Sequence, residues 1–216
     1  MANASPFSAR AVLLDWDGTL LDSYQADLRA YLAMFHALGI AWGVEDLERH
    51  YCPNWYEVYR AARLPRAKWP LADRLWRAAY RKQRPKLLPG ARSVVRALRS
   101  RYRLAIVTGG SQDRVSGQIR RFGLSASFPT CVFSEDTPRK KPHPAPLRLA
   151  LERLGARPEE CVYVGDAAED IEMARRAAVR PIGVLGPFPT AERIRAARPD
   201  LLLDSIRELP QHLCMA

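Results

Sequence analysis

The chain has 216 residues, of which 48% are hydrophobic and 26% charged, a globular balance that suits one large domain or a domain with an insertion. The net charge of +11 raises nucleic acid as a partner. The basic residues are scattered over helical segments, however, which argues against nucleic acid and favours a small anionic substrate. No apolar run approaches the roughly 20 residues of a membrane span, and the N-terminus lacks the apolar core of a signal peptide.

The four cysteines show no CxxC spacing, so a zinc site is not expected. Cys131 and Cys161 lie inside apolar runs, as buried free thiols do. This pattern favours a cytoplasmic location. Both a monomer and a homodimer are compatible with the sequence.

Short apolar runs predict six strands, at 11–15, 103–108, 130–134, 161–166, 180–184 and 200–205. The runs are unbroken rather than alternating, which is typical of a parallel sheet covered on both faces. Helical patterns separate most of them, at 90–100, 112–122, 144–154, 168–178 and 190–197. Strands that alternate with helices predict an α/β fold with a doubly wound parallel sheet.

Residues 22–88 break this alternation. They contain no convincing strand, and apolar residues recur at three- and four-residue spacing along most of the interval. The interval is too long for an ordinary crossover. We therefore expect a helical domain at 22–88, inserted into an α/β core made of 1–21 and 89–216.

Acidic residues follow two of the predicted strands. Asp15 and Asp17 end the first strand and share one side of it, because side chains alternate along a strand. Asp166 ends the fourth strand, and Asp170 follows one helical turn later. Ligands of open α/β sheets bind beyond the carboxyl ends of the strands, so we expect these carboxylates to converge. Close carboxylates require a cation, and a few oxygen ligands with room for water and phosphate suit Mg²⁺.

Small and basic residues follow two further strands. Thr108, Gly109 and Gly110 lead into a predicted helix, where free backbone N–H groups and close approach would suit an anion. The loop after the third strand carries Lys140 and Lys141, and a lysine at this edge would complete the neutralisation of a phosphate.

Together these segments resemble the haloacid dehalogenase (HAD) superfamily. The stretch DWDGTL, Thr108 after a strand, KPHP and GDAAED match its four motifs in order, over residues 11 to about 205. The best match is the phosphoglycolate phosphatase and β-phosphoglucomutase-like branch. The resemblance implies a Rossmannoid core and identifies the helical insertion as a C1-type cap.

The resemblance also implies an activity, that of a Mg²⁺-dependent phosphoric monoester hydrolase acting on a small phosphorylated metabolite through an aspartyl-phosphate. Asp15 resembles the nucleophile and a metal ligand. Asp17 resembles the general acid and base, with its backbone carbonyl rather than its carboxylate on the metal.

The remaining motif residues take supporting roles in this resemblance. Thr108 would hydrogen-bond a phosphoryl oxygen, beside the turn at Gly109 and Gly110. Lys141 would stabilise charge on the nucleophile and the phosphate; Lys140 is the alternative, and Lys141 is preferred because Pro142 follows it. Asp166 would bind Mg²⁺ directly, and Asp170 directly or through water.

Several alternatives remain open within the family. Asp17 favours phosphoryl transfer over dehalogenation, because a halide leaving group needs no proton. A β-phosphoglucomutase-like mutase, a phosphonate hydrolase using Lys68 or Lys82 as a Schiff base, and a catalytically silent HAD-like binding module are the alternatives to a phosphatase.

Residues 50–60 are a candidate specificity loop, because Pro53 interrupts the helical pattern there and aromatic residues are frequent. We expect Asn54, Trp55 and Arg60 to face the substrate. The competing interpretation is that the aromatic side chains of this stretch simply pack the core of the cap.

Overall fold

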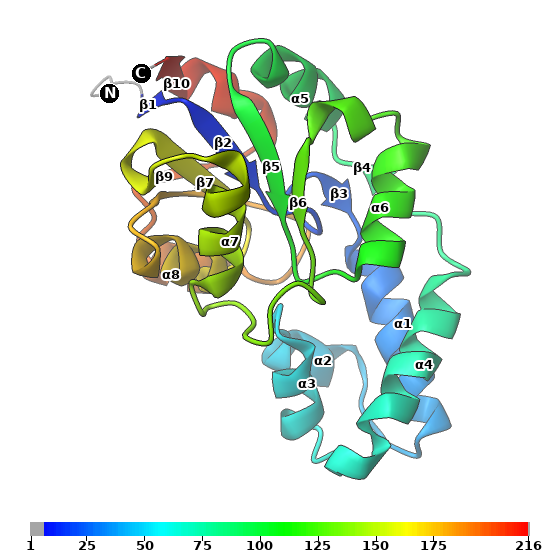
Figure 1. Cartoon of the computed structure of the whole chain (residues 1–216). Helices are drawn as coiled ribbons and strands as arrows, with labels where there is room; N and C mark the ends of the chain where they lie inside the picture. The colour runs from blue at the N-terminus through cyan, green and yellow to red at the C-terminus, as the bar shows by residue number, and fades with distance from the viewer. Residues whose placement is uncertain (1–6, 216) are drawn as a thin grey trace.

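The computed structural model describes residues 7–215 and has a six-stranded sheet at its centre (Figure 1). The order across the sheet is β6-β5-β2-β7-β8-β9, and every neighbouring pair is parallel. The strands are β2 (Ala11–Leu14), β5 (Arg103–Val107), β6 (Thr130–Val132), β7 (Cys161–Gly165), β8 (Arg180–Val184) and β9 (Leu201–Leu203). The predicted doubly wound α/β fold is thus confirmed.

Helices cover both faces of the sheet, which explains the unbroken apolar runs. The helices α5 (Ala91–Arg99) and α6 (Gln112–Arg121) share an apolar cluster with Val12 and Leu14 of β2. Their neighbours in sequence, Ala11 and Leu13, pack on the opposite face with α7 (Ala145–Leu154) and α8 (Ala168–Arg176). Both sets are buried, so no position along β2 can be polar. The short α9 (Ala191–Ala196) packs against α8.

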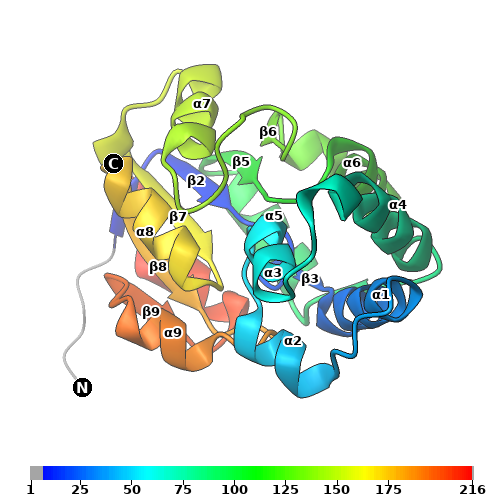
Figure 2. The same ribbon diagram turned by 90° about the horizontal axis from the view of Figure 1, so that it is seen from below.

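Four helices that follow β2 lie beyond the carboxyl edge of the sheet, and we call them the cap helices (Figure 1). They are α1 (Tyr24–Ala37), α2 (Val44–His50), α3 (Trp55–Ala61) and α4 (Trp69–Tyr80). They have an apolar cluster of their own around Met34, Phe35 and Val58. The helices α1 and α4 lie side by side, as Figure 2 also shows. Division into domains at 22 and 88 stays a prediction.

Two pairs of short strands were not expected from the sequence. The strands β3 (Leu21–Asp22) and β4 (Lys86–Leu87) pair antiparallel where the chain enters and leaves the cap helices, so the expectation of no strand in 22–88 was wrong. The strands β1 (Phe7–Ala9) and β10 (Leu213–Met215) pair in parallel. Two or three residues are too few for a strand pattern to stand out in a sequence.

Short 3₁₀ turns complete the chain: η1 (Arg66–Lys68), η2 (Ser125–Ser127), η3 (Pro158–Glu160) and η4 (Ile206–His212). Across residues 7–215 we find no helix with the length and apolar character needed to cross a bilayer.

Candidate active site

A cavity of about 120 Å³ lies between the carboxyl edge of the sheet and the cap helices. On the side of the sheet it is lined by Asp15, Asp17, Thr108, Gly109, Lys141 and Asp166. The central strand β2 lies at its base, between β5 and β7. The strand order reverses at β2, the position where open α/β sheets bind their ligands.

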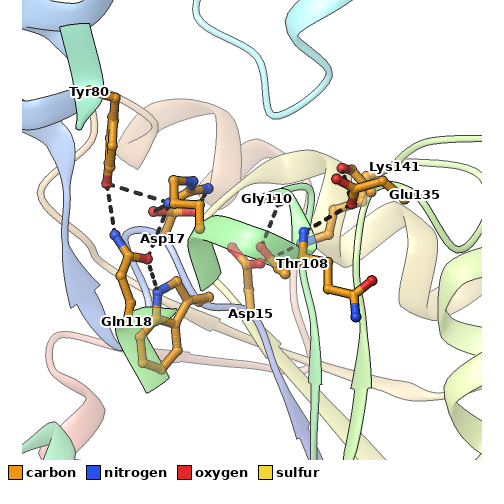
Figure 3. Close-up of polar contacts among 12 residues, drawn as sticks. Asp15, Asp17, Tyr80, Thr108, Gly110, Gln118, Glu135 and Lys141 are labelled. Carbon is orange, nitrogen blue, oxygen red and sulfur yellow. Dashed lines mark hydrogen bonds and ion pairs between the residues drawn. The ribbon is translucent and has the colours of Figure 1, made fainter. Parts of the chain in front are cut away.

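Lys141 joins two of the acidic residues. Its Nζ lies 2.8 Å from Oδ1 of Asp15 (Figure 3). It also lies 2.7 Å from Oδ1 of Asp170, and the residue is only 3% exposed. Burial alone would lower the pKa of Lys141, but the two carboxylates outweigh burial and raise the pKa above its usual value. The ammonium is therefore charged at neutral pH.

Lys140 has different partners. Its ammonium donates to the backbone carbonyls of Ser134 and Thr137, which belong to its own loop. Of the two neighbouring lysines, Lys141 is the one that reaches Asp15 and lines the cavity.

Asp15, Asp166 and Asp170 form a buried acidic cluster, in which one oxygen of each carboxylate lies within 4.8 Å of the others. Burial raises the pKa of Asp15 to about 7, because the charges of Asp170 and Asp17 add to it and Lys141 only partly opposes it. Burial and the charges of Asp15 and Asp170 raise the pKa of Asp166 well above its usual value. One lysine cannot balance three carboxylates, so the cluster fits a divalent cation.

Local hydrogen bonds hold the cluster in place. Asp170 accepts from the backbone N–H of Ala167 (3.1 Å) and from the hydroxyl of Tyr163 (3.2 Å). Asp166 accepts from the Thr19 hydroxyl (3.3 Å). Gly18 turns the chain at a φ of +79°, and a Cβ at that position would lie 2.1 Å from Oδ2 of Asp166. The turn after β2 can therefore pack against Asp166 only with glycine.

Asp17 points away from the cluster and pairs with Arg114. Nη1 of Arg114 lies 2.9 Å from Oδ1 of Asp17, and Nη2 lies 2.6 Å from Oδ2 (Figure 3). Burial would raise the pKa of Asp17, but the guanidinium outweighs it and lowers the pKa below its usual value. Tyr80 and Gln118 contact the same guanidinium at 3.4 Å.

Arg114 was missed in the sequence analysis, although one signal was available. It lies in the first turn of α6, where a cation opposes the helix dipole and is unfavourable without a partner. An arginine in that position suggests an anion nearby.

The turn at Thr108 also lines the site. Thr108 Oγ1 accepts from the backbone N–H of Gly110 at 3.0 Å, which leaves the hydroxyl hydrogen free to donate into the cavity. Gly110 has no space for a side chain, since a Cβ would lie 2.3 Å from Nη2 of Arg114. At Gly109 the turn meets the α2–α3 loop, because a Cβ would lie 3.2 Å from the carbonyl of Pro53.

Of the three residues between 50 and 60 that were expected to face the substrate, one lines the cavity and two do not. Trp55 lines the cavity. Asn54 and Arg60 lie outside its lining, where the amide of Asn54 contacts Glu57 at 3.4 Å and Arg60 pairs with the same carboxylate. Their expected contact with substrate gains no support from this arrangement. Tyr59, assigned to the core in the competing interpretation, is 1% exposed but also lines the cavity.

Other residues of the cap helices line the cavity and were not expected from the sequence. They include Asp27 and Tyr31 of α1 and Asp73 and Arg77 of α4. On an amphipathic helix such residues cannot be told from an ordinary polar face.

Comparison with known proteins supports the assignment to a family. A family model described as haloacid dehalogenase-like hydrolase matches residues 9–178. Pyrophosphatase PpaX of Bacillus velezensis is 29% identical over 204 residues, covering 92% of this chain and 94% of that protein. Phosphoglycolate phosphatase of Nitrosococcus oceani is 27% identical over 217 residues, covering 95% and 96%.

Solved structures have the same fold. CbbY of Rhodobacter sphaeroides, crystallised with phosphate, superposes with a TM-score of 0.79 at 29% identity and covers 93% of this chain and 96% of its own. A hydrolase from Pseudomonas syringae superposes with a TM-score of 0.84 at 22% identity, covering 94% and 97%.

Proposed function

The chain belongs to the haloacid dehalogenase-like hydrolase family, and we propose that it is a Mg²⁺-dependent phosphatase that hydrolyses a small phosphate monoester through an aspartyl-phosphate. The observation that carries the proposal is the position of Asp15, whose carboxylate contacts Lys141 and faces the cavity beside Asp166. A nucleophile, a cation and a metal-binding cluster are together what an anionic group needs in order to attack an anionic phosphate.

The first step forms a bond between a carboxylate oxygen of Asp15 and phosphorus while the ester O–P bond breaks. Lys141 reduces the repulsion between nucleophile and phosphate, and the Thr108 hydroxyl donates to a phosphoryl oxygen. Asp15, Asp166, Asp170 and the backbone carbonyl of Asp17 would hold Mg²⁺, which when bound offsets the charge of the phosphoryl group.

Asp17 handles the proton in both steps. Its carboxyl group gives a proton to the leaving alkoxide, and the resulting carboxylate then takes a proton from the water that hydrolyses the aspartyl-phosphate. Since Arg114 holds Asp17 ionised, we infer that this ion pair opens or loosens before the proton is donated.

The structure bears on one alternative. A phosphonate hydrolase would need a lysine of the cap in the site, but Lys68 and Lys82 lie outside the cavity lining and Lys141 belongs to the sheet side. The chemistry at the cavity therefore supports a phosphate ester as the substrate. A cytoplasmic location stays a prediction.

The direct test is hydrolysis of p-nitrophenyl phosphate with Mg²⁺ and with EDTA. We expect turnover that requires the metal and is abolished in Asp15→Asn. Asp200→Asn, which changes an exposed carboxylate just before β9, serves as the matched control and should keep full activity. Metal-dependent turnover that persists in Asp15→Asn would refute Asp15 as the nucleophile.

A further inference from the structure

The wall of the cavity opposite Asp15 differs in chemistry from the sheet side. The cap helices and the α2–α3 loop line it with aromatic residues: Tyr31, Tyr51, Trp55, Tyr59 and Trp76. Two carboxylates, Asp27 and Asp73, lie among them. Arg77 is the one cation that this wall contributes among the described lining residues, and its side chain is exposed.

Neither carboxylate is neutralised by the protein. Within residues 7–215, Asp27 and Asp73 form no ion pair, although Asp73 accepts a hydrogen bond from the Tyr59 hydroxyl at 2.9 Å. Burial raises the pKa of Asp27 to about 7, and the charge of Asp17 adds to this effect while Arg114 and Trp76 oppose it. Both side chains are half-buried, and a carboxylate that lines a cavity without a cation beside it suits a ligand that supplies one.

Tyr31 provides an independent sign that the cavity suits a polar ligand. The residue is 5% exposed and lines the cavity one helical turn after Asp27, on the same face of α1. Its hydroxyl makes no hydrogen bond to another residue in the described part of the chain and is not among the fully enclosed polar atoms, so it opens into the cavity. A hydroxyl in that position can donate to or accept from a polar group of a ligand.

Aromatic rings at this cavity already accommodate cations. Nζ of Lys140 lies 5.7 Å from the ring centre of Trp55, and the guanidinium of Arg114 lies 5.8 Å from that of Trp76. Ring faces attract ammonium cations, and aromatic rings that surround a cavity are a common way in which proteins bind quaternary and methylated ammonium groups.

An anionic leaving group would find little support here. The two other cations of the lining are committed, since Arg114 pairs with Asp17 and Lys141 with Asp15. A carboxylate on the leaving alcohol would therefore approach Asp27 and Asp73 with Arg77 alone to offset the repulsion.

We propose that the leaving alcohol of the substrate carries an ammonium group, which Asp27 and Asp73 bind within the aromatic wall formed by the cap helices. The inference rests on the proposed phosphatase function, because it assigns the leaving-group half of the same cavity. It identifies a class of substrate, the phosphate monoesters of amino alcohols.

The test compares three esters of similar size with Mg²⁺: 2-aminoethyl phosphate, propyl phosphate and 2-phosphoglycolate. We expect kcat/KM for the ammonium ester to exceed those for the other two by about tenfold or more. Asp27→Asn and Asp73→Asn should each lower this preference, the ratio of kcat/KM for 2-aminoethyl phosphate to kcat/KM for propyl phosphate, several-fold. Glu45→Gln, an exposed acid on α2 outside the cavity, is the matched control.

Measurements of substrate binding test this inference independently of the proposed phosphatase activity. Calorimetric titration of Asp15→Asn with the same three esters measures the preference without turnover. Tighter binding of 2-aminoethyl phosphate, weakened in Asp27→Asn, supports the inference even where no ester is hydrolysed. Equal binding of all three esters, or a preference for 2-phosphoglycolate, would overturn it.

Discussion

Arg114 and Asp17 form a bidentate ion pair that joins the first turn of α6 to the turn after β2. The planar guanidinium matches both carboxylate oxygens and so fixes the orientation of Asp17 as well as its charge. Tyr80 of α4 lies against the same group, with its ring centre 5.0 Å from Cζ of Arg114. The ion pair therefore connects the proposed proton donor to the cap helices.

Arg114→Gln should slow the hydrolysis of an ester more when its leaving group has to be protonated. An alkyl phosphate releases a basic alkoxide, so misplacing Asp17 should lower its kcat/KM by about tenfold to a hundredfold. The nitrophenolate of p-nitrophenyl phosphate leaves without a proton, so its kcat/KM, which reports only the steps up to formation of the aspartyl-phosphate, should change by less than about threefold. Steady-state kinetics on both substrates checks this, and Arg114→Lys should recover part of the alkyl activity. Equal losses on both substrates would show that Arg114 does not act through Asp17.

Removal of the metal should change stability as well as activity. Binding of Mg²⁺ to the native cluster alone adds about 2.7 kcal/mol at a hundredfold excess over Kd, which raises the melting temperature by roughly 5–10 °C. We expect Asp166→Asn to lose this Mg²⁺-dependent shift without melting lower than the metal-free wild type, because it relieves repulsion with Asp15. Scanning calorimetry with and without EDTA measures both effects, and Asp200→Asn should behave as wild type.

The sequence predicts best what depends on local patterns. Buried strands are visible as unbroken apolar runs, and parallel strands bring their carboxyl ends together, so the convergence of Asp15 and Asp166 follows from the sequence alone. The pairing of Arg114 with Asp17 does not, because it joins residues 97 positions apart through the orientation of α6.

In the cap helices, the sequence could not show which side chains face the cavity. Asn54 and Arg60 were expected at the substrate because they belong to residues 50–60, an aromatic-rich stretch that Pro53 interrupts, but the orientation of α3 determines which side chains face the cavity. Trp55 and Tyr59 are four residues apart and share the face that lines the cavity, whereas Arg60 is rotated about 100° from Tyr59 toward solvent. Choosing that face from sequence would require knowing how α3 lies over the sheet.

The burial of Asp27 should make stability depend on pH. Its pKa is raised to about 7 in the folded chain, above the value of 3.8 for an unperturbed carboxyl group, so the folded state holds the proton more tightly. The free energy of unfolding should therefore fall as pH rises from about 4 to about 7. Asp27→Asn should remove this part of the slope, so that the variant gains stability over wild type at pH 8 and not at pH 4. Urea unfolding at several pH values checks the sign, and an unchanged slope would contradict it.

A comparison of alanine variants at Gly18 and Gly39 distinguishes two effects at Gly18: the steric clash of a side chain with Asp166, and the strain of a positive φ. Gly18 and Gly39 have φ values of +79° and +73°, so alanine at either position carries a similar strain of about 1–2 kcal/mol. A Cβ at Gly39 meets nothing within 4 Å, whereas a Cβ at Gly18 would lie 2.1 Å from Oδ2 of Asp166. Gly39→Ala should therefore lose only that strain energy and keep its activity. Gly18→Ala should lose more stability and most of its turnover, because Asp166 must move from the metal-binding cluster. Denaturant melts and p-nitrophenyl phosphate kinetics on the pair measure the difference, and equal behaviour of the two variants would mean that Gly18 is needed for its backbone conformation alone.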